Sequence, residues 1–564
     1  MTKRTGIALA TAIAAILLSG LASEDARADC FNKPYSCLPP GDIDPATSRD
    51  YVSLYRAYAA LVWQDFLALN FPAATDGQGN PLPQPSSSQG LDTGTGSYIP
   101  VWQTYIEARE LFLPNGAAPA PFASGHPLPQ SCRNLNRSGV RLLLNRVSKA
   151  GDVHGLTPPA GRDIQSMLTH GKRVNSDTEL AQKLTAAQNN DGVLDEYVQA
   201  LRMGPVIDQN GNYLRFGLNF NKAMYDYIVS NQLYNVEGQQ AFDTNPNHNG
   251  NPVQFPAGVF GGDPGSIFVK SSWKILSGPD NAARFFRVPA YIYDEAGGPF
   301  GDDPTVEERC SIATVGLVGF HVVHLTNSAP QWVWATFEHL DNAPWLADFR
   351  VGTPSGSYSL FNPALCPAQG GAPSCTYNTI PAHPWNPQIP NQTPVQVVRV
   401  APPGLYAEVT NANAAQAITN AYGSTVWQNY FLVDVQFPTI VDVVNPATGQ
   451  AVPNPAYPDG VPTPSFLANS TLETYIQGFG PAAATTNGNV IPSDDQMQAA
   501  NSGAARVNPF STVVYNQSGG APRETSGCVS CHFDATLTTG SSSHFVFSLS
   551  RAQSMQPLSP AEGQ

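Results

Sequence analysis

The feature that most constrains this chain is a short run near its C-terminal end, Cys528-Val529-Ser530-Cys531-His532. This C-x-x-C-H pattern is the attachment signature of c-type haem. Its two thiols can add to the two vinyl groups of one porphyrin, while the adjacent histidine supplies an axial nitrogen to the iron. We therefore predict one covalent haem c, with thioether bonds at Cys528 and Cys531 and with His532 as the proximal iron ligand.

A C-x-x-C pair also occurs in zinc sites and in thiol redox sites. Zinc would need a second pair of ligands close in the sequence, and no such pair is present near Cys528. The sequence therefore favours haem over zinc.

The position of the motif excludes the ordinary small cytochrome folds. Only 32 of the 564 residues follow His532, so the helices and distal methionine of a single-domain cytochrome c have no room. The preceding run 508–527 contains two prolines and two adjacent glycines, which excludes the long helix of the four-helix type. We predict that residues 508–564 form a haem-attachment segment that packs on a large body, residues 29–507, and is not an independent domain.

The first 28 residues read as a signal peptide. Lys3 and Arg4 form a positive start, residues 7–21 are apolar, and Ala26-Arg27-Ala28 fits a cleavage site. No later stretch is long and apolar enough to span a bilayer. These features predict export to the periplasm, with cleavage after Ala28.

Six further cysteines accompany the haem motif. An even number in an oxidising compartment favours disulfides, and short loops are the easiest to close. The sequence therefore predicts three pairs, although six cysteines allow many connectivities: Cys30 with Cys37, Cys366 with Cys375, and Cys132 with Cys310.

The formal net charge of −14 argues against nucleic acid as a partner, because a phosphate-binding surface needs a basic excess. The expected partners are a periplasmic redox protein or a small-molecule substrate. Hydrolase and nucleotide-binding motifs are not present.

The patterning predicts a mixed α+β body with an antiparallel sheet, peripheral helices and long loops rich in proline and glycine. Helical periodicity is clearest from Arg49 to Leu69 and weaker over residues 179–203, 219–233, 411–421 and 464–478. Strand-like runs cover Phe286–Tyr293, Thr314–Leu325, Gln331–His339, Val395–Val400 and Tyr430–Gln436.

The runs Thr314–Leu325 and Gln331–His339 form the best hairpin candidate and carry the densest polar and aromatic chemistry. In a strand, His321 and His324 point to opposite faces, so a metal shared by both is not expected. In the second strand one face carries Trp332, Trp334, Thr336 and Glu338, an aromatic wall that ends in a carboxylate. This wall could form a substrate pocket or an electron path, and core packing is the alternative. The candidate catalytic residues are His321, His324, Trp334, Glu338 and His339.

The sixth position of the iron has several candidate ligands. Met555 and His544 lie downstream of the motif, and His321, His324, His339 or His383 could reach the iron from the body. A thioether suits electron transfer, whereas an open position permits chemistry on small ligands. The sequence does not choose between them.

Several segments resemble large exported proteins called cytochrome c family proteins, which carry one C-terminal C-x-x-C-H motif. The similar segments are Trp63 to Pro72, Val101-Trp102, Lys270 to Lys274, His321 to Asn342, Leu467 to Thr474, and Cys528 to His532. The resemblance implies haem c and redox work, without a defined substrate.

The sequence thus predicts a periplasmic monohaem c-type cytochrome that transfers electrons or acts as a haem-dependent oxidoreductase, with the body shaping the site beside the iron. Whether the chain is an enzyme stays open. The alternative is a ligand-binding or sensing protein in which haem is structural or reporting.

Overall fold

The computed structural model describes these residues: 37–87, 89–91, 98–122, 128–135, 142–146, 206–246, 253–294, 307–379, 393–439, 442–444, 448, 450–453, 460–463, 465–477, 513–514, 523–524, 527–532 and 535–555. The predicted signal peptide and the predicted helix 179–203 lie outside these ranges.

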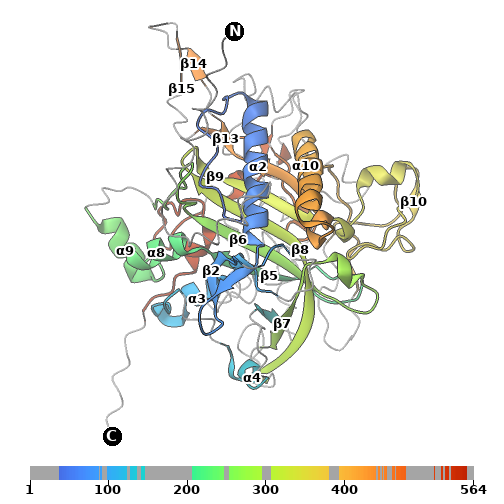
Figure 1. Cartoon of the computed structure of the whole chain (residues 1–564), viewed down its shortest axis with the longest axis horizontal. Coiled ribbons are helices and arrows are strands. Elements are labelled where there is room, and N and C mark those ends of the chain that lie inside the picture. Colours follow the sequence, from blue (N-terminus) through green and yellow to red (C-terminus); the bar gives the residue numbers. More distant parts are fainter. Residues whose placement is uncertain are drawn as a thin grey trace, which may run out of the picture.

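The described chain combines helices and antiparallel sheet in one α+β fold, as predicted (Figure 1). The α-helices are α2 (Tyr51–Leu69), α3 (Ala108–Leu111), α4 (Gln130–Arg133), α8 (Lys222–Ser230), α9 (Val236–Thr244), α10 (Leu405–Tyr422) and α13 (Cys528–His532). The strands of the main sheet are β3 (Ile106–Glu107), β4 (Leu142–Arg146), β5 (Arg215–Phe220), β6 (Ile267–Ile275), β7 (Arg287–Asp294), β8 (Arg309–Thr326), β9 (Ala329–His339) and β12 (Tyr430–Gln436). Two-stranded sheets pair β1 (Ala73–Thr75) with β2 (Pro81–Pro85), β10 (Ala368–Gln369) with β11 (Ala372–Pro373), β13 (Pro438–Thr439) with β16 (Val461–Pro462), β14 (Asp442–Val444) with β15 (Ala451–Pro453), and β17 (Val513–Val514) with β18 (Arg523–Glu524).

The long strand β8 organises the main sheet, whose order runs β12-β9-β8-β6-β5-β3. The second half of β8 pairs antiparallel with β6 and β9, and its first half pairs with β7, which carries β4 in parallel. A two-residue turn, Asn327-Ser328, joins β8 to β9, so the predicted hairpin is confirmed and its turn is shorter than the sequence indicated.

One face of the main sheet packs against α2 and α10, which lie side by side in front of the strands (Figure 1). Helix α2 begins where Asp50 accepts a hydrogen bond from the Ser53 amide, a typical N-cap. Phe66 of α2 stacks on Phe337 of β9 with ring centroids 4.3 Å apart, and Trp63 meets the same ring edge-on. We call this side of the sheet the helix face.

The opposite side of the sheet is covered by the loop 465–477 and by the C-terminal residues 527–555. Alternation along β9 separates the two sides: Val333, Ala335 and Phe337 join the core under α2, whereas Trp332 and Trp334 pack with Val529 and Leu549 of the C-terminal segment. We call this second side the C-terminal face. Of the predicted attachment segment, residues 527–532 and 535–555 pack on this face.

Most of the predicted elements in the described ranges are present, and two predictions were wrong. Residues 464–478 were expected to be helical, but the described part of this range, 465–477, forms turns and a short 3-10 helix, Thr474–Ile476. The cause is local: the Asn469 side chain accepts hydrogen bonds from the Thr471 amide and hydroxyl, which competes with helix formation. The run 395–400 is not a strand: it contains one β-bridge, Trp345 with Arg399, and separate backbone hydrogen bonds such as that from the Val397 amide to the Leu360 carbonyl.

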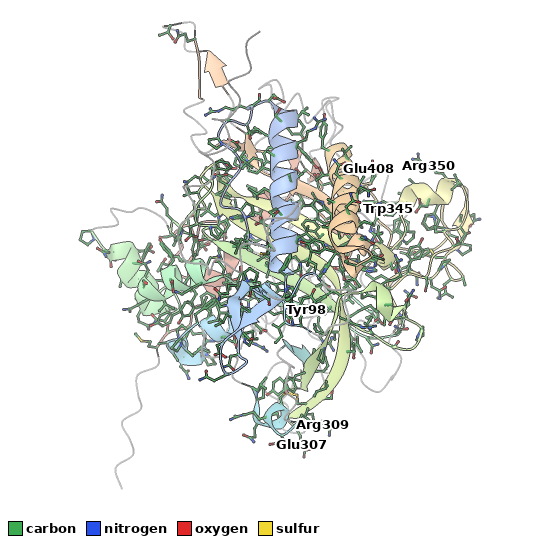
Figure 2. All side chains as sticks on the ribbon, viewed as in Figure 1. Tyr98, Glu307, Arg309, Trp345, Arg350 and Glu408 are labelled. Atoms are coloured by element: carbon green, nitrogen blue, oxygen red, sulfur yellow. A yellow bond between two sulfur atoms is a disulfide. The ribbon has the colours of Figure 1, made fainter. Side chains whose placement is uncertain are left out.

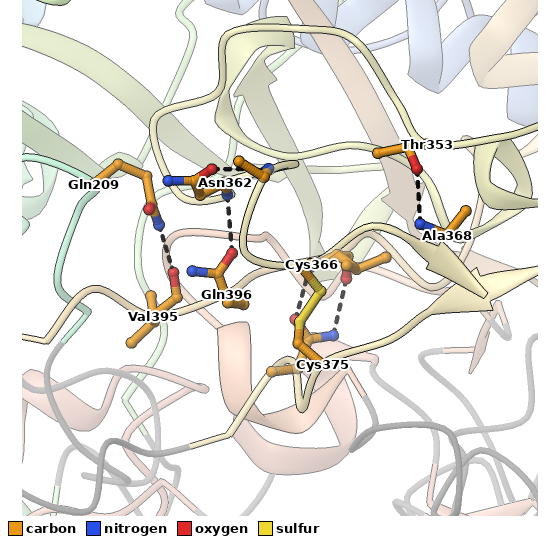
Figure 3. Close-up of a disulfide and its surroundings, with 11 residues drawn as sticks. Gln209, Thr353, Asn362, Cys366, Ala368, Cys375, Val395 and Gln396 are labelled. Atoms are coloured by element: carbon orange, nitrogen blue, oxygen red, sulfur yellow. Dashed lines mark hydrogen bonds between the residues drawn. A yellow bond between two sulfur atoms is a disulfide. The ribbon is translucent and has the colours of Figure 1, made fainter.

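Two of the three predicted disulfides are present, Cys132–Cys310 and Cys366–Cys375. Cys37 is also disulfide-bonded, and its predicted partner Cys30 lies outside the described residues. The Cys366–Cys375 bond closes a loop whose backbone is held by further hydrogen bonds, including one from the Asn362 amide to the Gln396 side chain (Figure 3).

The Cys132–Cys310 bond ties α4 to the start of β8. Figure 2 shows Glu307 and Arg309 beside α4 at this end of the strand, away from the C-terminal segment. In the described part of the chain, no helix is both long enough and apolar enough to cross a membrane.

Candidate functional site

The C-x-x-C-H motif forms one helical turn, α13, on the C-terminal face. In a helix, positions three and four residues apart lie on the same side, so 528, 531 and 532 share one face of this turn. The start of the turn is fixed by Gln436 of β12, whose Oε1 accepts from the Val529 amide (2.9 Å) and whose Nε2 donates to the Thr463 carbonyl (2.8 Å). A Cβ at position 527 would lie 2.8 Å from Gln436 Nε2, so a larger residue than Gly527 would displace this side chain.

The imidazole of His532 is oriented by one hydrogen bond. Its Nδ1–H donates to the Phe545 carbonyl oxygen at 2.8 Å. Burial lowers the pKa of His532 to about 4, against the opposing effect of this hydrogen bond. The ring is therefore neutral at physiological pH, and its second nitrogen, Nε2, carries the lone pair. No described residue hydrogen-bonds Nε2.

Aromatic side chains surround this imidazole. The ring of Trp334 lies 4.5 Å from that of His532, and the ring of Phe547 lies at 5.0 Å. Trp334 is buried, and its Nε1–H donates to the Gln331 carbonyl, so its orientation is fixed. The predicted aromatic wall on β9 therefore lies directly against the motif histidine.

The loop that supplies the Phe545 carbonyl is strained. His544 and Phe545 have positive φ values of 54° and 69°, and Trp332, which donates its Nε1–H to the His544 carbonyl, has a φ of 65°. Residues other than glycine rarely adopt this backbone conformation, and each instance costs on the order of 1–3 kcal/mol. The strain is concentrated at the residues that fix the acceptor of His532 Nδ1–H.

A polar cluster, Lys270, His321 and Glu473, lies on the same face. Lys270 and His321 are direct cross-strand neighbours on β6 and β8, and His321 Nε2–H donates to Glu473 Oε1 at 3.0 Å. Burial alone would raise the pKa of Glu473, but the charge and hydrogen bond of His321 and the charge of Lys270 lower it instead. The charges of all three groups also reach His532.

His324 points to the helix face, so the prediction that His321 and His324 lie on opposite faces is confirmed. Its Nδ1 lies 2.9 Å from Asp65 Oδ2 of α2, and its Nε2–H donates to the Pro264 carbonyl at 2.6 Å. Both side chains of the pair are fully buried. Burial by itself lowers the pKa of His324, but Asp65 and the Pro264 carbonyl outweigh it and raise the pKa.

Glu338 and His339 are held in structural contacts. Glu338 is buried and accepts from Arg399 Nε (2.7 Å) and from the Ser470 hydroxyl (2.6 Å). His339 accepts from the Asp341 amide through Nδ1 and donates Nε2–H to the Arg284 carbonyl. The structure therefore brings two of the five catalytic candidates, His321 and Trp334, near the motif histidine, and uses His324, Glu338 and His339 elsewhere.

The two downstream candidates for the sixth iron position, His544 and Met555, make other contacts. His544 uses both ring nitrogens: Nδ1 accepts from the Phe255 amide (3.2 Å) and Nε2–H donates to the Pro330 carbonyl (3.2 Å). Met555 is half exposed, and its amide donates to Glu237 of α9. His383 lies outside the described residues.

The residues present fit a covalent haem. The motif residues share one side of a helical turn, the histidine is neutral with a directed Nε2, and the adjacent wall is aromatic. Among the described residues, no cluster of three or more metal-ligating side chains is present.

The sequence reasoning did not single out Lys270, Glu473, Gln436 or the Phe545 carbonyl. Two lysines, Lys270 and Lys274, in the otherwise apolar and hydroxyl-bearing run Ile267–Ile275 were the available sign, because a charged side chain inside a strand needs an explanation. The role of a backbone carbonyl leaves no trace in the sequence.

Comparison with known proteins found no match: no family model, no curated protein and no solved structure is significantly similar to this chain.

Proposed function

We propose that this protein is a periplasmic monohaem c-type redox protein in which residues 527–555 and the C-terminal face of the main sheet form one site. Cys528 and Cys531 would carry the thioether bonds, and His532 would bind the iron through Nε2.

The observation that carries the proposal is the hydrogen bond from His532 Nδ1–H to the Phe545 carbonyl. Histidines that bind metals typically donate their other ring N–H to a carbonyl or carboxylate, which fixes the tautomer and aims the ligating nitrogen. A histidine in a zinc-free C-x-x-C redox pair has no need of this arrangement, and here it is supported by strained backbone.

Several side chains of this face would serve the redox site. Haem, when bound, supplies a one-electron iron couple. Trp334 and Phe547 pack against the His532 ring, and Gln436 anchors the motif turn to the sheet. The Lys270–His321–Glu473 cluster places a cation, a carboxylate and a titratable imidazole on the same face.

Both downstream candidates for the sixth iron position are engaged or exposed elsewhere. We propose that neither His544 nor Met555 binds the iron. A ligand-binding or sensing protein is the second candidate function for the same site.

The two disulfides agree with export to an oxidising compartment.

The test is expression of the full chain with export and cytochrome c maturation, followed by denaturing electrophoresis with a haem stain and by the alkaline pyridine spectrum. We expect a haem-stained band with the spectrum of two thioether bonds. The variants Cys528→Ser and Cys531→Ser should each show a one-thioether spectrum or no haem. Bound zinc and no haem in the wild-type protein would contradict the proposal.

A further inference from the structure

Two lysines of strand β6, four residues apart, differ in burial and in ion pairing. Lys274 is buried, and its Nζ lies 2.6 Å from Asp280 Oδ1 and 3.8 Å from Asp208 Oδ2. Lys270 is partly buried, and it forms no ion pair and no hydrogen bond within the described residues. Its Nζ lies over the ring of Phe216, 5.7 Å from the ring centroid.

The surroundings of Lys270 do not supply a full partner. Leu218 and His321 flank it on the neighbouring strands. The nearby carboxylate, Glu473, already accepts from His321 Nε2–H and from the Asn469 amide. Partial burial of the Lys270 ammonium, with no hydrogen-bond acceptor among the described residues, costs free energy. This position therefore favours binding of an anion that is not part of the polypeptide.

The position of Lys270 relative to His532 indicates which anion. Lys270, His321 and Thr336 form one cross-strand row, and Trp334, which contacts His532, lies in the next row of β9. Two strand spacings, about 10 Å, separate β6 from β9. This distance is on the scale of a porphyrin ring.

We infer that Lys270 binds a propionate carboxylate of the haem, with the neighbouring His321 completing the anion site. This inference rests on the proposed function, because it requires a haem at His532. It adds a specific contact between the body and the cofactor and makes Lys270 a positioning residue that also tunes the iron.

The test compares haem-loaded wild-type protein with Lys270→Met, Lys270→Arg and a matched control, Lys222→Met. Lys222 lies on α8 and forms an exposed ion pair with Asp226, so its loss should have no effect on the haem. Loss of the Lys270 charge should favour the oxidised state by about tenfold, which lowers the midpoint potential by about 59 mV for a one-electron couple. The propionate bending band in the resonance Raman spectrum should move in Lys270→Met and return in Lys270→Arg.

Each other result is decisive. A lowered potential with an unmoved propionate band would overturn the contact, because the lysine would then act only at a distance. A midpoint potential that responds to added acetate in the wild-type protein but not in Lys270→Met would assign the site to a solvent carboxylate instead. Unchanged haem spectra and potential would overturn the inference alone, whereas a wild-type chain without haem would overturn the proposed function as well.

Discussion

Similar histidine–carboxylate pairs are buried to different extents on the two faces of the main sheet. On the helix face His324 and Asp65 form a fully buried pair, sealed under α2. On the C-terminal face His321 and Glu473 form a similar pair at the edge of the site, with side-chain exposures of 11% and 16%. The two histidines are three residues apart on β8. The segments that cover each face determine how deeply each histidine is buried. This burial, more than the local sequence, determines which histidine is available for chemistry.

The same contrast separates the aromatic residues. The helix face is closed by rings that pack on each other, such as Phe66 on Phe337. On the C-terminal face Trp334 packs on a neutral imidazole whose second nitrogen has no described hydrogen-bond partner. One face therefore stabilises the fold, and the other holds the proposed redox site.

The largest expected effect is on the helix face. Asp65→Ala removes one partner of a fully buried pair and should lower the free energy of unfolding by about 3–5 kcal/mol. Glu473→Ala on the other face should cost less, about 1–3 kcal/mol, because that pair is not fully buried and solvent reaches part of it. Urea denaturation of both variants measures the difference. Equal losses would remove the distinction between the two faces.

A pH titration of stability sharpens the comparison next. Burial lowers the pKa of His339 from 6.5 to about 4, so the folded state binds fewer protons than the unfolded state between these values. The contribution of neutral His339 to the free energy of unfolding is therefore complete above pH 6.5, and it is lost as the pH drops toward 4, by up to about 3 kcal/mol. His339→Gln should flatten this dependence, and His321→Gln should retain it. An unchanged slope in His339→Gln would show that another group causes it.

A smaller effect is expected where the motif turn meets the sheet. Gln436→Ala removes the acceptor of the Val529 amide and the donor to the Thr463 carbonyl, so stability should fall by about 1–2 kcal/mol. Hydrogen exchange at residues 528–532 should accelerate more than exchange on β8. Gln428→Ala, at an exposed site, is the control. Uniform exchange in Gln436→Ala would mean that Gln436 does not anchor the turn.

The smallest effect is expected for the downstream iron-ligand candidates. Met555→Leu should leave the spin state and the visible spectrum of the ferric haem unchanged, because Met555 is half exposed beside α9. His544→Gln should do the same, provided the variant keeps the fold of the 535–555 loop, which circular dichroism monitors. A change from low-spin to high-spin iron in Met555→Leu would identify this thioether as the sixth ligand.

The sequence predicted the helix α2, the β8–β9 hairpin and its alternation, because periodicity is strong there and local. It did not predict β6, or the turns at 465–477, where side chains bond to backbone across long separations such as Asn469 to Phe337. It identified Trp334 and His321 but could not separate them from His324, Glu338 and His339. That separation depends on partners such as Asp65 and Arg399, which lie far away in the chain.

The most direct test of the account is the midpoint potential of His532→Ala compared with that of the wild-type protein. Thioether bonds at Cys528 and Cys531 do not need the axial ligand once formed, so the variant should keep at least part of its covalent haem. We predict that its normal redox behaviour is lost, because the imidazole held by the Phe545 carbonyl no longer binds the iron. A potential equal to that of the wild-type protein would contradict the assignment of His532 and, with it, the role of the C-terminal face.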